Sequence, residues 1–152
     1  MGSMVGIGPF SATSANSSSC ILSSKEAHLT YLVLIISLHF ILLSMPFLST
    51  SLAWTLTNVF HAVSMYYILH FCKGSPFAVH DQGKFRKFTY WEQIEDEWTK
   101  KVFNIIPVIL FVLAQFYSMF SHVPYNLAAL VVSLVPKWQV FYGYRLWGIN
   151  QH

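Results

Sequence analysis

The chain has 152 residues, of which 55% are apolar and only 10% are charged. A water-soluble domain carries about 25% charged residues, and a disordered chain is less apolar and more highly charged than this one. The composition therefore argues against both classes. The net charge of +3 is also too small for the dense basic patch of a nucleic-acid-binding protein.

Two long tracts, residues 27–72 and 102–136, contain no Asp, Glu, Lys or Arg. A helix needs about 20 apolar residues to cross the roughly 30 Å of membrane hydrocarbon. Each tract has space for two such helices and is interrupted once, near Pro46 and near Pro124. The pattern predicts an all-α membrane protein whose four transmembrane helices form two hairpins. The expected spans are about 28–47, 52–72, 103–120 and 124–141.

The last two predicted spans are near the short limit, which also allows local thinning of the bilayer, a re-entrant hairpin or shallow insertion. The alternative to a membrane protein is a soluble bundle of unusually apolar helices. Such a bundle does not need to avoid charge over whole tracts, whereas a charge at the centre of a membrane helix costs about 2.5–3.5 kcal/mol.

The basic residues predict the orientation. Residues 73–101 contain six Lys or Arg residues, whereas the turns at 44–51 and 121–124 contain none. Because loops rich in Lys and Arg remain in the cytosol, we expect this connecting segment and both termini to be cytosolic. Residues 1–27 then form a flexible Ser-rich cytosolic tail, and residues 28–152 form the membrane domain.

Polar residues within the predicted spans follow helical spacing and indicate packing faces, either within the bundle or toward a partner protein. One face of the first span carries Thr30, Ser37 and Ser44. A curved stripe on the second span carries Thr55, Asn58, His61 and Ser64.

The connecting segment is amphipathic over residues 84–102, with Phe88, Trp91, Ile94 and Trp98 near one side of a helix. This pattern favours either a helix lying on the membrane surface or a loop packed against another subunit.

No catalytic or metal-binding motif is apparent. The sequence lacks a Gly-rich phosphate loop and a Gly-x-Ser-x-Gly elbow, and both uncharged tracts lack carboxylates. His61 and His70 are nine residues apart, so they face opposite sides of a helix. We therefore expect a non-enzymatic chain without a cofactor or metal site, in which intramembrane histidines pack helices.

Several motifs, in the same order along the chain, resemble those of the Orm/ORMDL family. They are Leu38-His39, Leu43-Ser44-Met45-Pro46-Phe47, Trp54-Thr55-Leu56-Thr57-Asn58, Lys73-Gly74-Ser75-Pro76-Phe77, Asp81-Gln82-Gly83, Trp91-Glu92-Gln93, Pro136-Lys137 and Gly143–Asn150. The resemblance covers roughly residues 29–150. It implies an Orm-like four-helix domain in a multi-pass protein of the endoplasmic reticulum membrane.

The resemblance also implies a function, because family members bind and inhibit serine palmitoyltransferase, which catalyses the first step of sphingolipid synthesis. The chain would be a non-catalytic subunit giving negative, ceramide-responsive control of this pathway. The implied partners are the enzyme's large subunits and small activating subunit, ceramide and membrane lipids. Candidate partner-binding residues are Asn58, His61, Pro76, Phe77 and Trp91. The alternative is a membrane scaffold or chaperone of the same fold that does not bind the enzyme.

The N-terminal tail departs from the family pattern. Family tails read Asn-Pro-Asn-Thr-Arg, whereas this chain has Asn16-Ser17-Ser18-Ser19-Cys20, and Tyr90 stands where the family often has His. Because Ser and Tyr can still hydrogen-bond a lipid headgroup, Asn16, Ser18 and Tyr90 are the candidate ceramide-sensing residues. The tail is similar to fungal members that are released by phosphorylation, so Ser17, Ser18 and Ser19 are candidate phosphorylation sites, unless the tail is only a flexible polar segment.

Overall fold

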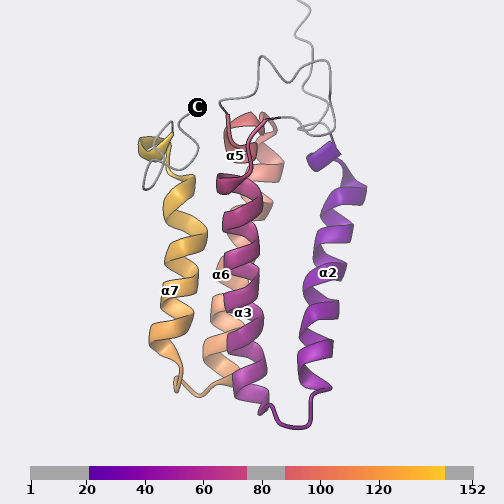
Figure 1. The fold of residues 1–152 in the computed structure, drawn as a ribbon, viewed down its shortest axis with the longest axis vertical. Helices are drawn as coiled ribbons and strands as arrows, with labels where there is room; N and C mark the ends of the chain where they lie inside the picture. The colour runs from indigo at the N-terminus through magenta and orange to yellow at the C-terminus, as the bar shows by residue number, and fades with distance from the viewer. Residues whose placement is uncertain (1–20, 75–87, 143–152) are drawn as a thin grey trace, which may run out of the picture.

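The computed structural model describes residues 21–74 and 88–142 (Figure 1). In these ranges the long helices are α2 (Lys25–Leu43), α3 (Thr50–Tyr66), α6 (Glu97–Tyr117) and α7 (Val123–Leu134), and α5 (Tyr90–Gln93) is a short helix at one end of the bundle. A π-helix, η1 (Tyr67–Phe71), continues α3, and the 3-10 turns η3 (Val135–Lys137) and η4 (Gln139–Phe141) follow α7. The all-helical prediction is confirmed for the described part of the chain.

Hydrogen-bonding side chains set where three of the long helices, α2, α3 and α6, begin. The hydroxyls of Ser24 and Ser49 accept from the backbone N–H of the third residue of α2 and of α3, at 3.1 and 3.2 Å. The carboxylate of Asp96 does the same for α6 at 2.8 Å. Each cap satisfies a backbone N–H that has no partner within its own helix.

The predicted spans match the helices in order but differ at several ends. The first span was expected to reach residue 47, yet α2 ends at Leu43 because the chain must leave the helix ahead of Pro46. The third was expected to begin at 103, yet α6 begins at Glu97 because Asp96 caps it. The fourth was expected to reach 141, yet regular α-helix ends at Leu134 because Pro136 has no N–H.

The expectation of a surface-lying helix over residues 84–102 is wrong for the part of that segment that the structure describes. Helix α5 ends at Gln93, and an extended break precedes α6. Trp91 and Ile94 are only 3% and 1% exposed, and they pack with Met65, Leu69 and Phe103. Trp91 and Ile94 therefore help to close one end of the bundle, whereas Phe88 and Trp98 remain exposed.

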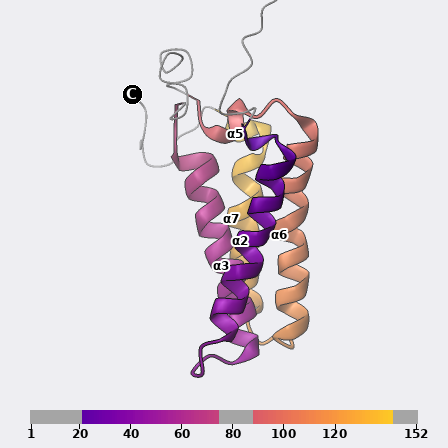
Figure 2. The ribbon, with the colours of Figure 1, turned by 90° about the vertical axis from the view of Figure 1, so that its right-hand side faces the viewer.

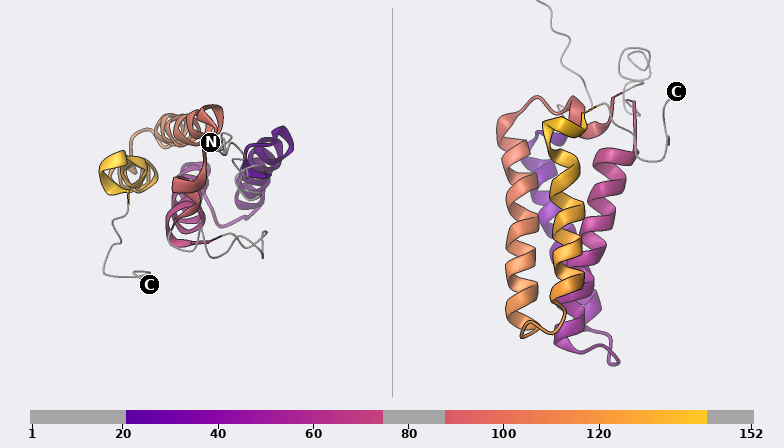
Figure 3. Two further views of the ribbon diagram at one scale, coloured as in Figure 1. Left: turned by 90° about the horizontal axis from the view of Figure 1, so that it is seen from above. Right: turned by 90° about the vertical axis from the view of Figure 1, so that its left-hand side faces the viewer.

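Helix α3 is the central element of the bundle. It packs against α2, α6 and α7, and α6 and α7 also pack against each other. Figures 2 and 3 show α2 on the outside of this group, next to α3. Leu42 is the one buried residue of α2, so this helix lies on the bundle and is little enclosed by it.

Small and polar side chains fill much of the interior of the bundle, next to an apolar cluster at one end, and the outside of the bundle is apolar. Buried positions on α3, α6 and α7 include Ala53, Thr57, Asn58, Ala114, Gln115, Asn126, Ala129 and Ser133. Outward positions carry large apolar side chains such as Leu34, Phe40, Ile105, Val112, Phe116 and Val131, which are 48–63% exposed or, for Phe116, 70%. This distribution is the reverse of that in a water-soluble domain.

The two predicted packing faces have different surroundings. Thr55, Asn58 and His61 are buried inside the bundle, whereas Ser64 is exposed. Thr30, Ser37 and Ser44 all lie on the exposed side of α2. Helices α2 and α6 are long and apolar enough to cross a membrane by length and composition. Helix α3 together with η1 covers residues 50–71, and α7 is shorter.

Candidate functional site: the charged end of the bundle

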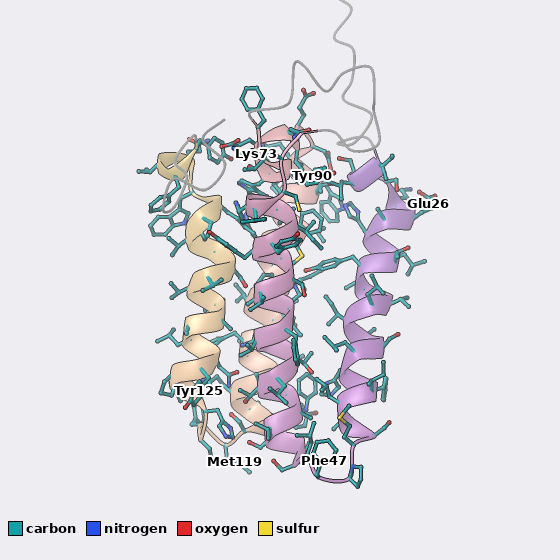
Figure 4. The ribbon with its side chains drawn as sticks, in the orientation of Figure 1. Glu26, Phe47, Lys73, Tyr90, Met119 and Tyr125 are labelled. Atoms are coloured by element: carbon teal, nitrogen blue, oxygen red, sulfur yellow. The ribbon has the colours of Figure 1, made fainter. Side chains whose placement is uncertain are left out.

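Every charged residue in the described ranges lies at one end of the bundle, which we call the charged end. They are Lys25, Glu26, Lys73, Glu92, Glu95, Asp96, Glu97, Lys100, Lys101 and Lys137. Figure 4 shows Glu26, Lys73 and Tyr90 at this end and Phe47 and Met119 at the opposite, uncharged end. The segments on either side of residues 75–87 also meet here.

A hydrogen-bonded network joins the start of α2 to the start of α6. The Thr99 hydroxyl donates to the Asp96 carboxylate at 2.6 Å, and its oxygen lies 3.0 Å from Nε2 of His28. Since the single hydroxyl proton of Thr99 points to Asp96, Nε2 of His28 must carry the proton in the second bond. The hydrogen bonds from the Thr99 side chain and backbone lower the pKa of Asp96 below its usual value. The carboxylate therefore stays ionised and anchors α2 to α6.

Lys137 fills a gap in the hydrogen bonding of α6. Pro107 has no N–H, so the carbonyl of Phe103, four residues earlier, lacks its normal helical partner. Nζ of Lys137 donates to this carbonyl at 2.5 Å, although the Lys137 side chain belongs to the turn after α7. Lys137 is only 6% exposed. It therefore connects the end of α7 to the proline-containing turn of α6.

The same lysine holds α5 in place. Nε1 of Trp91 donates to the backbone carbonyl of Lys137 at 3.1 Å, and the ammonium lies 5.5 Å from the centre of the Trp91 ring. The cation and the ring attract each other at this distance. Trp91 is therefore fixed by two contacts with one residue, and α5 is connected through Lys137 to both α6 and α7.

The two ends of the connecting segment are fastened together. Gly74 donates its backbone N–H to the carbonyl of Phe88 at 3.2 Å, and its φ of 77° is a conformation that favours glycine. The side-chain amide of Gln93 donates to the carbonyls of both residues at 3.0 Å. Thr89 and Glu92 form a capping box that begins α5. The described residues on either side of 75–87, Gly74 and Phe88, therefore lie next to each other.

Tyr90 lies in the apolar cluster beneath this junction. It is 8% exposed and packs with Met65, Leu69 and Trp91. Burial, and secondarily the charge of Cys72, raises the pKa of Tyr90 above its usual value. The phenol therefore stays neutral at physiological pH and keeps its proton available for a hydrogen bond.

Two polar clusters lie deeper in the bundle. The amide of Asn58 donates to the side chain of Asn126 at 3.2 Å, and Asn126 donates to Gln115 at 3.2 Å, which joins α3, α7 and α6. On the other side of α3, the hydroxyl of Tyr31 is 2.6 Å from Nε2 of His61. These bonds hold helices together where apolar packing alone is small.

The sequence-predicted site residues divide into three groups. Asn16, Ser17, Ser18, Ser19, Pro76 and Phe77 lie outside the described residues. Tyr90 and Trp91 are adjacent and share the apolar cluster at the charged end. Asn58 and His61 are buried in the bundle, at 2% and 4% exposed, and bond to different helices. The structure thus brings together Tyr90 and Trp91 but leaves Asn58 and His61 in separate clusters.

Several residues of the charged end were missed by sequence reasoning. Thr99, Asp96 and His28 come from two helices, and no spacing along the chain connects them. Lys137 had one detectable signal, because Pro107 inside an apolar helix leaves a carbonyl four residues earlier that needs a donor. Within the described ranges, no group of three or more His, Cys, Asp or Glu side chains gathers as metal ligands would.

We predict that Lys137→Met lowers the stability of the bundle by about 1–3 kcal/mol, because it leaves the buried Phe103 carbonyl without a donor. Pro107→Ala supplies a backbone N–H for that carbonyl, so Lys137→Met should have a clearly smaller effect in the Pro107→Ala background. Unfolding in mild detergent measures all four proteins of this cycle.

Lys101→Met is the matched control, since Lys101 is exposed on the same end of α6. It should change stability little. An equal loss from Lys137→Met with and without Pro107 would contradict the assignment of Lys137 to the carbonyl.

Comparison with known proteins agrees with the motifs. Residues 16–145 match the profile of the ORMDL family. Over 143 residues the chain is 41% identical to ORM1-like protein 2 of Mus musculus and 42% identical to ORM1-like protein 1 of Bos taurus. ORM1-like protein 1 of Danio rerio is 41% identical over the same length. Each match covers 90% of this chain and 94% of the relative. The chain therefore belongs to the ORMDL family.

Proposed function

We propose that this chain is a non-catalytic subunit that binds and inhibits serine palmitoyltransferase in the endoplasmic reticulum membrane. Control is negative and responds to ceramide, so sphingolipid synthesis slows when its product accumulates. The observation that carries this proposal is the family match, which extends from the tail at residue 16 to residue 145. Because regulation of this enzyme is the family role, the match favours it over a scaffold that lost the enzyme.

The proposed arrangement in the membrane has four spans in two hairpins, with the charged end in the cytosol. Three features support it. All described charges lie at one end, the outward surface is apolar, and many interior side chains are polar. In addition, Trp98 and Tyr117 lie at opposite ends of α6, 19 residues apart, which is about 28 Å of helix. Aromatic side chains at this separation suit the two interfaces of a bilayer.

A structural use of the interior polar groups supports a non-catalytic role. Asn58, Asn126 and Gln115 bond to one another, and His61 bonds to Tyr31. Because these groups hold helices together, their arrangement resembles helix packing more than a nucleophile with a base. Asn58 and His61 would then affect the enzyme through the shape of the bundle.

Ceramide sensing is proposed at the charged end, where the tail and α5 are both within reach. Asn16 and Ser18 precede Ser24, the cap of α2, by eight and six residues, which is at most about 20–29 Å of extended chain. The start of α2 is in turn bonded to α6 through His28 and Thr99. Tyr90 offers a neutral phenol at the same end, so a lipid headgroup there could bond to both elements.

The first test is association with the enzyme. We expect affinity purification of the full chain in mild detergent to recover the large subunits of serine palmitoyltransferase and the small activating subunit. Deletion of the chain should raise long-chain base levels, because an inhibitor is lost. Recovery of other membrane proteins without the enzyme, together with unchanged long-chain bases, would instead support the scaffold or chaperone alternative.

The second test addresses ceramide. We expect three variants to weaken the inhibition of the enzyme by added ceramide, namely Asn16→Ala, Ser18→Ala and Tyr90→Phe. In each variant the enzyme should still bind to the chain. Tyr125→Phe is the matched control, because it removes the same hydroxyl at the uncharged end, where Tyr125 is 65% exposed. A normal ceramide response in all three variants would remove the sensing role from these residues.

A further inference from the structure

The uncharged end of the bundle exposes large apolar side chains on both of its turns. Phe47, between α2 and α3, is 78% exposed, and Met119 and Phe120, between α6 and α7, are 85% and 70% exposed. Figure 4 shows Phe47 and Met119 at this end, opposite Glu26 and Lys73. Neither turn contains a charged residue. Both turns carry the Ser or Pro residues that are common in turns, so the unusual feature is the exposure of three large apolar side chains beside them.

The backbone of the second turn makes these side chains more unusual. The N–H of Phe120 donates to the carbonyl of Gln115 at 3.2 Å, which ends α6 as a Schellman motif. Met119 occupies the position that is usually glycine and has a φ of 47°, and Phe120 has a φ of 61°. Both are strained for residues with a side chain. An environment that favours the two side chains would offset that strain.

The usual partner for the apolar side chain of such a motif is absent here. In a Schellman motif the residue at the position of Phe120 normally packs on the residue at the position of Gln115. Gln115 is polar, only 6% exposed, and bonded to Asn126 inside the bundle. Phe120 therefore points away from the bundle, toward whatever surrounds the turn.

Helix α6 as a whole is long enough to cross a membrane, but the uncharged part of the second hairpin is shorter than the hydrocarbon layer. The uncharged part of α6, residues 102–117, is about 24 Å long at 1.5 Å per residue. Helix α7 and η3 together are also about 24 Å. Membrane hydrocarbon is roughly 30 Å thick. Apolar side chains on the turn would lengthen the apolar surface of the hairpin and so make up the difference between its length and the thickness of the hydrocarbon.

We propose that Phe47, Met119 and Phe120 form a lipid-binding tip that inserts among phospholipids at the boundary between headgroups and acyl chains. Lipid is the occupant that fits best, because Phe47, Met119 and Phe120 are apolar and their turns contain no Asp, Glu, Lys or Arg with which a protein partner could pair. The tip is also continuous with Phe116, which is 70% exposed on the outward surface of α6. This inference depends on the four-span arrangement proposed above.

Site-specific fluorescence in vesicles tests the tip. In full-length protein carrying Cys20→Ser and Cys72→Ser, a single cysteine at Phe47 or Met119 is labelled with NBD and reconstituted in phosphatidylcholine vesicles. Quenchers are lipids with a nitroxide at acyl carbon 5 or 12, and iodide present on both sides of the membrane. We expect the strongest quenching by the carbon-5 nitroxide, weaker quenching by carbon 12, and little by iodide.

Two control positions separate the tip from the membrane arrangement. Leu34→Cys, 63% exposed near the middle of α2, should be quenched best by the carbon-12 nitroxide, and Glu97→Cys, at the charged end, best by iodide. If the label at Leu34 is quenched by the lipid nitroxides while the labels at Phe47 and Met119 are quenched mainly by iodide, the proposed lipid-binding tip is wrong. The four-span arrangement would still hold in that case. If Leu34 is itself quenched mainly by iodide, the four-span arrangement fails, and the tip fails with it.

Discussion

Membrane hydrocarbon cannot hydrogen-bond a polar group, and in the proposed arrangement this constraint explains why polar side chains pair between the helices. An unsatisfied backbone group in hydrocarbon costs several kcal/mol, so a bundle in lipid must pair its polar groups internally. Pro107 creates such a group by leaving the Phe103 carbonyl without a helical donor, and Lys137 reaches from the end of α7 to fill the gap. The same pairing through Trp91 positions α5. The missing N–H of Pro107 therefore explains why Lys137 reaches α6, and Trp91 joins α5 to the backbone of the same residue.

The charged end differs from the rest of the bundle because its contacts hold the start of α2 and the two ends of the connecting segment against the other helices. His28 and Thr99 join the start of α2 to α6, and Gly74, Gln93 and Phe88 join the two ends of the connecting segment. The N-terminal tail ends at the start of α2, and residues 75–87 begin just after Gly74, so both join the bundle at its charged end.

The helix order, the family and the breaks near Pro46 and Pro124 could be predicted, because absent charge and proline are local signals in the sequence. The helix ends were less predictable, since Asp96 begins α6 through a hydrogen bond that hydropathy does not reveal. Trp91 resembled a membrane-surface aromatic, but its indole N–H is bonded to Lys137, 46 residues later. Contacts between distant segments, such as Asn58 with Asn126, leave no trace in spacing along one helix.

The central claim is that lipid, and not water, surrounds the outward face of these helices. Photolabelling in native membranes with a phospholipid that carries a diazirine on its acyl chain, followed by peptide mass spectrometry, tests it most directly. Adducts should concentrate on outward residues such as Leu34, Ile109 and Val131 and should be absent from inward Thr57, Asn58 and Asn126. Labelling of the inward positions, or none on the outward ones, would contradict the account.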